Sequence, residues 1–209
     1  MAISTLSRLS IPLASDQTAS NQGLLMPKLK YRFRVTLEGF GVSDTIELTK
    51  QVVDVTRPNV SFEPITLDAY NSKVFLAGKH TWQTITLNIR DEVTGQVQRL
   101  VGEQLQKQFD FYEQASAAAG NSYKFLTRIE ILDGGNGTFD PVILETWECA
   151  GCFLTQVDYG NLAYNANEAV QIALTIQPDN CIQIPPATGV GADVGRLDGL
   201  QVVNSTGQS

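Results

Sequence analysis

The sequence predicts a mainly β protein, an antiparallel β-sandwich or barrel with one flanking α-helix. Segments in which apolar and polar residues alternate with period two recur along the chain, as in half-buried antiparallel strands. One stretch, residues 97–112, instead has apolar residues at helical spacing. Clusters of Gly, Pro, Asn and Asp separate these segments and predict turns. The 209 residues, 43% of them hydrophobic, suffice for one domain with a sizeable core.

The first half of the chain predicts four strands. Residues 31–38 alternate clearly, and residues 52–55 and 60–62 suggest two more strands. Pro64 confines the third of these to an edge or an end of a sheet, because proline donates no backbone hydrogen bond. The fourth is Thr81–Arg90, and its buried side chains are expected to be Ile85, Leu87 and Ile89.

An amphipathic helix is expected next, packed on the sheet. Asp91 or Thr94 could cap its start, and Gly120-Asn121 would end it after an alanine run. Its apolar face would hold Val97, Leu100, Val101, Leu105, Phe109, Phe111 and Tyr112.

The remaining strands are predicted at residues 123–131, 144–159, 170–176 and 181–184. The glycine run before the second of these leads into a strand, so it is not a phosphate-binding loop. Gly151 marks a bend, beyond which Phe153, Thr155, Val157 and Tyr159 are expected to share one face. Val170, Ile172, Leu174 and Ile176 should share the apolar face of their strand.

The composition excludes some classes of protein. The net charge of −7 argues against a free-standing nucleic-acid binder, which normally carries a basic face. Three cysteines make a poor disulfide framework and suggest synthesis in a reducing compartment. No apolar run approaches the ~20 residues of a membrane helix. The N-terminus also lacks the continuous apolar core of a secretory signal.

The sequence predicts neither an enzyme nor a cofactor or metal site. Cys149 and Cys152, with Cys181 and His80, could formally ligate zinc, but the second short-spaced ligand pair of a structural zinc site is missing. A redox pair would start a helix, whereas these thiols lie at a bend between strands, so packing is the better interpretation. The sequence has no Gly-x-Ser-x-Gly nucleophile elbow with which His80 could form a hydrolytic site.

Three regions are expected: an N-terminal arm at 1–27, a β domain at 28–184 and a C-terminal tail at 185–209. The arm is rich in Ser, Gln and Asn, and it is expected to be flexible alone or ordered only against a neighbour; the alternative is a disordered leader with no role. The tail after Pro185-Pro186 is expected to have little structure of its own.

The order of several motifs resembles the tail tube proteins of contractile-tailed bacteriophages, which are related to the Hcp tube protein of type VI secretion. The resemblance covers about Lys28 to Ile184. It rests on the Tyr31-Arg32-Phe33-Arg34-Val35 strand, on Val74 to Trp82 leading into Ile85-Thr86-Leu87, on Asp91-Glu92, on Tyr123-Lys124-Phe125, on Leu144 to Phe153, on Val157 to Gly160 and on Val170 to Ile176.

This resemblance implies subunits that form hexameric rings, which stack into a tube around a continuous inner β-barrel. It also implies a long loop that reaches the next ring, and Asp68–Lys79 occupies that position. The segment reads as a projecting loop or long hairpin with apolar residues near its tip, although these could instead fold back onto the core. The expected inter-ring contacts are Tyr70, Asn71, Lys73, Phe75 and Leu76.

The polar face of the later strands is the candidate wall of the lumen or of the contact between subunits. An acidic lumen would repel phosphate, so that DNA slides through without specific binding. Ring closure would also remove the open strand edges of a monomer. The candidate residues are Glu148, Gln156, Asp158, Gln171 and Thr175.

The expected function is therefore that of a structural subunit of a phage tail tube, without a membrane partner. The resemblance implies sheath and baseplate proteins as partners, assembly in a bacterial cytoplasm and a final place in the virion. One alternative is a tube subunit of a secretion or contractile injection system. Another is a carbohydrate-binding β-sandwich, which would need exposed aromatic platforms, whereas Trp82 and Trp147 look core-facing.

Overall fold

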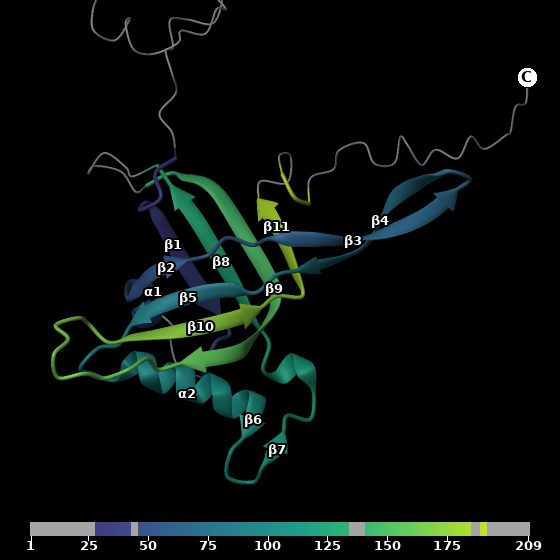
Figure 1. Ribbon diagram of the computed structural model, residues 1–209. Helices are drawn as coiled ribbons and strands as arrows, with labels where there is room; N and C mark the ends of the chain where they lie inside the picture. The colour runs from purple at the N-terminus through teal and green to yellow at the C-terminus, as the bar shows by residue number, and fades with distance from the viewer. Residues whose placement is uncertain (1–27, 43–45, 134–140, 185–188, 192–209) are drawn as a thin grey trace, which may run out of the picture.

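The computed structural model describes residues 28–42, 46–133, 141–184 and 189–191 (Figure 1). The arm at 1–27 and most of the tail at 185–209 lie outside this part of the chain. The helices are α1 (Ile46–Lys50) and α2 (Gln96–Gln108), with a short 3-10 turn at Gly120–Ser122. The strands are β1 (Phe33–Glu38), β2 (Val52–Val55), β3 (Val60–Ala69), β4 (Ser72–Trp82), β5 (Ile85–Arg90), β6 (Phe109–Asp110), β7 (Ala115–Ser116), β8 (Phe125–Leu132), β9 (Ile143–Asp158), β10 (Gln171–Gln177) and β11 (Asn180–Ile184).

The main sheet follows the order β1-β8-β9-β10-β5-β2, with β11 also paired to β9. All these pairs are antiparallel, which confirms the predicted fold class. The sixteen-residue strand β9 joins two layers, because its first half pairs with β8 and β11 and its second half pairs with β10. β1 and β2 are the two ends of this path.

The bend in β9 depends on Gly151, which has a φ of +68°. A glycine reaches this left-handed conformation without the strain that a Cβ would bring. A Cβ here would also lie 2.3 Å from a carboxylate oxygen of Asp179, which pairs with Lys124. Gly151 therefore lets one strand serve both layers.

The core lies between these layers and is closed by α2. The predicted core residues Ile85, Leu87 and Ile89 of β5 are fully buried, as are Ile172, Leu174 and Ile176 of β10. α2 contributes Val97, Leu100 and Val101. Val170 precedes β10 and stays 41% exposed, so the apolar face of this strand begins at Ile172.

The helix is shorter than the sequence predicts. α2 ends at Gln108, and Phe109–Asp110 turns back to pair with Ala115–Ser116 as the β6–β7 hairpin. Phe111 and Tyr112, expected on the helix, are exposed in its turn. The N-cap is Gly95 without a side-chain cap, so neither Asp91 nor Thr94 has the predicted role.

Two glutamines on α2 tie the helix to neighbouring backbone. Gln104 is fully buried; its Oε1 accepts from the Gly41 amide at 2.9 Å, and its Nε2 donates to the Tyr123 carbonyl at 2.6 Å. One turn later, Gln108 both accepts from and donates to the backbone of Leu154 on β9. The Gln108 amide thus bonds both backbone groups of Leu154, as a neighbouring strand would, and satisfies their need for hydrogen-bond partners.

A bulge at Thr155 changes the faces of β9. Thr175 lies opposite Gln156, whereas Ile176 lies opposite Leu154, so Thr155 is an extra residue. Val157 therefore faces the core beside Leu174, and Phe153 faces the other way beside Gln177. The prediction that residues 153, 155, 157 and 159 share one face is wrong, because period-two alternation cannot cross a bulge.

The β3–β4 hairpin projects away from the sheet (Figure 1). β3 runs through Pro64, which sits at a register shift, as an edge proline can. A Cβ on Gly78 would lie 2.4 Å from the Glu63 carbonyl oxygen, so the two strands require glycine there. Among the described residues, no helix is long and apolar enough to cross a membrane.

Candidate assembly surfaces

The β3–β4 hairpin carries all five residues expected to contact the next ring. Tyr70 is fully exposed at the tip with a φ of 54°, and Asn71 is exposed beside it. Phe75 and Leu76 are 65% and 49% exposed on β4. Lys73 faces Asp68 across the hairpin at 4.0 Å, an exposed ion pair of little energetic weight. These side chains do not fold back onto the core.

The hairpin has two different faces, which the sequence prediction did not separate. Ile65 lies opposite Leu76 and Leu67 opposite Val74, so four aliphatic side chains form one face, each 46–50% exposed. Phe75 lies on the other face, opposite Thr66. We call the four residues Ile65, Leu67, Val74 and Leu76 the aliphatic face of the hairpin. This face could have been predicted from the sequence, because aliphatic residues alternate with other residues at positions 65 and 67 and again at positions 74 and 76.

Four of the five candidate lumen residues share one face of the sheet. Gln156 pairs with Thr175, and Asp158 pairs with Ala173 between Thr175 and Gln171. Directly opposite residues in antiparallel strands point to the same side, so Gln156, Asp158, Gln171 and Thr175 lie together. We call the outer surface of β9, β10, β5 and β2 the polar face.

Neighbouring strands continue the polar face with residues that the sequence analysis did not single out. Arg90 lies opposite Gln171, Asn88 opposite Ala173 and Thr86 opposite Thr175. On β2, Asp54 accepts a hydrogen bond of 2.9 Å from the Asn88 side chain. The face is mostly uncharged: it carries the carboxylates of Asp54 and Asp158 and the guanidinium of Arg90.

Glu148 lies elsewhere. It belongs to the first half of β9, opposite Arg128 and Ile182, and its carboxylate is 3.7 Å from the Arg128 guanidinium. The bend at Gly151 separates this residue from the polar face, and period-two counting along one strand could not show that.

The three cysteines are fully buried and free. Cys149 and Cys181 lie directly opposite each other on β9 and β11. Their mutual hydrogen bond, together with burial, raises the pKa of Cys149. Burial raises the pKa of Cys152 to about 11. Within the described part of the chain, no three His, Cys, Asp or Glu residues are grouped so that they could hold a metal ion.

The tryptophans differ from each other. Trp82 is buried and its indole nitrogen donates to the Asn180 side chain at 3.3 Å. Trp147 is only partly buried and donates to Glu145. Burial alone would raise the pKa of Glu145, but hydrogen bonds from Lys28 and Trp147 outweigh it and leave the pKa below its ordinary value.

The fold is thus a two-layer antiparallel β structure with a bent shared strand, a flanking helix and a projecting hairpin. It is similar to a chain of the anti-feeding prophage cap, described as the tube terminating cap, with a TM-score of 0.58 and 15% identity over 80% of this chain and 97% of that chain. It is also similar to a chain in the sheath–tube complex of the PVC extracellular contractile injection system, with a TM-score of 0.52 and 17% identity over 77% and 93%. A chain in the sheath/tube terminator of that system gives a TM-score of 0.51 and 15% identity over 76% and 96%.

These similarities confirm, at the level of the fold, the resemblance inferred from the motif order. At such low identity they show a shared fold. No protein-family model and no curated protein matches the sequence.

Proposed function

We propose that this protein is a structural subunit of the inner tube of a contractile tail, assembling as hexameric rings that stack end to end. The observation that carries the proposal is the combination of the polar face with the projecting hairpin, on a fold similar to chains from contractile injection particles. In the particle, sheath and baseplate proteins would be its partners.

The polar face supports a wet inner wall. On β5 and β10 its outward side chains are polar or small, while the inward side chains of the same strands are fully buried aliphatic residues. Such a sheet can face water on one side and a packed core on the other. Within the described residues, β2 pairs only with β5, so its other edge is open to a strand of a neighbouring subunit.

The hairpin supports stacking. A two-stranded hairpin is at best marginally stable in water, and this one exposes an aliphatic face on one side. Contiguous exposed apolar surface of this kind marks a contact site. Covering that face with the next ring would stabilise both the hairpin and the tube.

For the cargo, we propose DNA in a phage tail, made in the bacterial cytoplasm and carried in the virion. The polar face adds only a small negative charge, from two carboxylates and one guanidinium, so phosphate would not be held there. A tube of an injection system with protein cargo is the alternative. The similarity of the fold to chains of an extracellular contractile injection system favours it.

A ring that terminates the tube is a second candidate function. It is favoured by the similarity to chains from a tube terminating cap and from a sheath/tube terminator. A terminator would form a single ring, whereas a tube subunit would form stacks that lengthen with concentration.

Electron microscopy of the purified protein over a range of concentrations tests these alternatives. We expect rings with a central hole that elongate into tubes as concentration rises. Single rings at every concentration would favour the terminator. A monomer that persists at high concentration would contradict both functions.

A further inference from the structure

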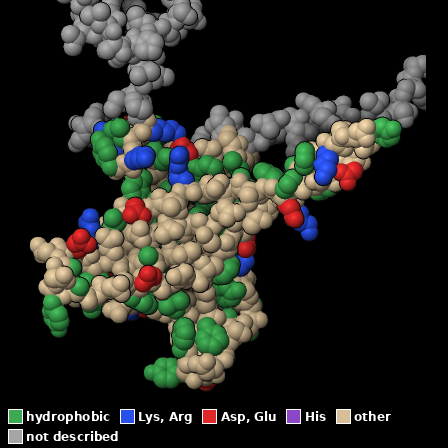
Figure 2. Space-filling view, viewed as in Figure 1, with side chains coloured by type: hydrophobic (Ala, Val, Ile, Leu, Met, Phe, Trp, Pro, Cys, Tyr) green, Lys and Arg blue, Asp and Glu red, His purple; other side chains and the backbone are tan. Residues whose placement is uncertain are grey.

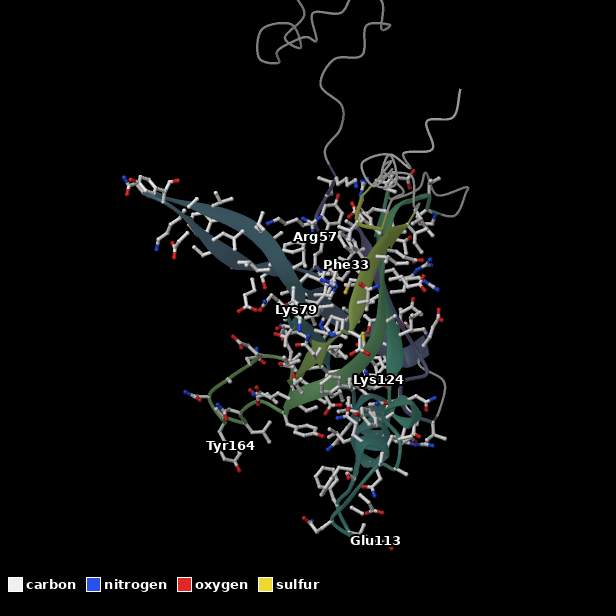
Figure 3. The ribbon with its side chains drawn as sticks, turned by 90° about the vertical axis from the view of Figure 1, so that its right-hand side faces the viewer. Phe33, Arg57, Lys79, Glu113, Lys124 and Tyr164 are labelled. Atoms are coloured by element: carbon white, nitrogen blue, oxygen red, sulfur yellow. The ribbon has the colours of Figure 1, made fainter. Side chains whose placement is uncertain are left out.

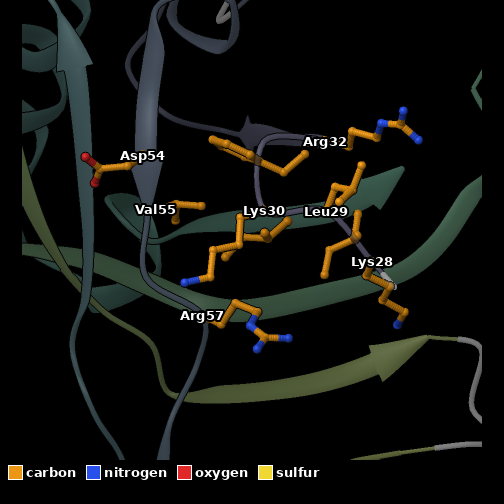
Figure 4. Close-up of a pocket in the computed structure, with 10 residues that line it drawn as sticks. Lys28, Leu29, Lys30, Arg32, Asp54, Val55 and Arg57 are labelled. Atoms are coloured by element: carbon orange, nitrogen blue, oxygen red, sulfur yellow. The ribbon is translucent and has the colours of Figure 1, made fainter. Parts of the chain in front are cut away.

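A groove of about 510 Å³ lies at one end of the subunit, between the start of β1 and the end of β2 (Figure 4). β1 and β2 are the terminal strands of the sheet path, so the groove marks the seam where the sheet does not close. Its apolar lining is formed by Leu29, Phe33, Val55, Ile129 and Ile131. We call this feature the seam groove.

Four cationic side chains surround the seam groove: Lys28, Lys30, Arg32 and Arg57. Lys28 pairs with Glu145, and Arg32 donates to the Asp133 carbonyl. Lys30 and Arg57 are exposed and form no ion pair with any residue that the structure describes, although the charge of Arg57 helps to lower the pKa of Glu145. Asp54 is the one acid in the lining, and its carboxylate accepts from Asn88 on the polar face. The groove therefore suits an occupant with apolar and acidic side chains.

The β6–β7 turn has this chemistry. Tyr112 is 97% and Phe111 56% exposed, and Glu113 is exposed beside them. The carboxylate of Asp110 accepts from the backbone amides of Tyr112 and Glu113 at 2.9 and 3.3 Å. These bonds fix the turn and lower the pKa of Asp110. Phe111 also packs edge-on against Phe109, with 5.3 Å between ring centres.

The groove and the turn lie at opposite ends of the subunit. Figure 3 labels Glu113 at one end and Arg57 and Phe33 toward the other. In Figure 2, Lys and Arg side chains gather at the upper end of the molecule, and a hydrophobic patch covers the lower end. One molecule therefore carries two complementary surfaces that it cannot bring together by itself.

We propose that the β6–β7 turn of one subunit docks into the seam groove of a second copy, head to tail. Phe111 and Tyr112 would cover the apolar lining, and Glu113 would pair with Lys30 or Arg57. The guanidinium of Arg57 can also stack on an aromatic ring. Contacts between two different surfaces of one protein generate closed rings where the rotation closes and open stacks where it does not, and surfaces at opposite ends of the subunit suit a stack. The inference rests on the proposed function, because it supplies a second contact between stacked rings besides the hairpin.

Charge reversal with rescue tests the contact. Glu113→Arg, and separately Lys30→Glu combined with Arg57→Glu, should each raise the concentration needed for tube assembly at least about tenfold, since like charges then face each other across the contact. Combining all three substitutions should return it to within about threefold of the wild type. Glu168→Arg, the same charge change in an exposed loop outside the turn, should leave assembly unchanged. Tubes would be counted by electron microscopy and sedimentation, and folding checked by thermal melting.

Several outcomes would overturn the contact. If wild-type tubes form and the variants that reverse only one side of the contact assemble as well as the wild type, the docking is wrong while the proposed function stands. If the combined variant assembles as poorly as the single reversals, the charges do not face each other, and the docking is again wrong. Failure of the wild type to assemble at all would contradict both the docking and the proposed function. Tyr112→Ser, which leaves the charges intact, should also weaken assembly; no effect would count against the aromatic half of the contact.

Discussion

At the scale of single residues, the two layers depend on positions where backbone requirements are unusually strict. Gly151 bends β9 in a left-handed conformation that most side chains avoid. Gln104 and Gln108 supply amide groups to backbone atoms that no strand pairs. The Cys149 and Cys152 thiols beside the bend are buried and have raised pKa values, as suits packing rather than reactivity.

Gly151→Ala should lower the free energy of unfolding by about 1–3 kcal/mol, because alanine strains the positive φ. Its methyl group must also displace Asp179 from its place beside Lys124. Chemical denaturation of the unassembled subunit would measure this change. Gly102→Ala is the matched control, since a Cβ at Gly102 on α2 meets nothing within 4 Å. Equal stability of the Gly151 variant and the wild type would show that the bend does not require glycine.

The Asp110 carboxylate makes the β6–β7 turn sensitive to acid. Its pKa is lowered in the fold by the backbone amides of Tyr112 and Glu113, so the ionised form is the one that stabilises the turn. That contribution is complete above the ordinary carboxyl pKa and is lost as the pH falls through the lowered value. NMR titration should show the Tyr112 and Glu113 amide signals shifting with the Asp110 carboxyl. An Asp110 pKa at or above the ordinary value would contradict this.

At the scale of elements, the hairpin shows how alternation specifies a surface. Its aliphatic face holds Ile65, Leu67, Val74 and Leu76, whereas Phe75 projects from the opposite face. We expect the aliphatic face to carry the larger share of the contact between rings, because apolar area removed from water is the main favourable contribution to association. α2 is shorter than the helix that the sequence predicts, because Phe109, Phe111 and Tyr112 fit a helical pattern but form a separate hairpin.

Leu76→Ser should weaken ring stacking by about 0.8–1.5 kcal/mol per subunit, roughly half the value of fully burying a leucine, because about half of this side chain is already covered in the subunit. Phe75→Ser should weaken it less, and the double variant should stay folded but not stack. Each variant can be followed by thermal melting and by tube length in electron micrographs. Tubes of normal length from the double variant would contradict the hairpin contact; a larger effect of Phe75→Ser would place the contact on the other face.

At the scale of the whole molecule, assembly would convert surfaces that are exposed in the single subunit into contacts between subunits. The hairpin projects from the subunit, whereas the seam groove adjoins the polar face at Asp54 of β2. The edge strands β1 and β2 leave the monomer with an open sheet, which ring formation would protect.

The position of the polar face can be tested by labelling. Gln156→Cys should react with a small maleimide in both subunits and tubes, but a bulky polymer maleimide should be excluded from the tube lumen. Gln98→Cys, on the exposed side of α2, should react with both reagents in both states. The native thiols are buried and give a low background. Equal reaction of Gln156→Cys with the bulky reagent in tubes would place the polar face outside the lumen.

The fold class, most strand positions and the apolar side of β5 and β10 could be predicted from the sequence alone, because burial of one face imposes a period of two. The sequence also placed the projecting hairpin, whose apolar residues have no core to join. The positions at which the faces of β9 change could not be predicted, because the bend at Gly151 and the bulge at Thr155 reset the alternation and are visible only in the folded chain. The same is true of the seam groove, because Lys30 and Arg57 are brought together by sheet pairing between segments that are separate in the chain.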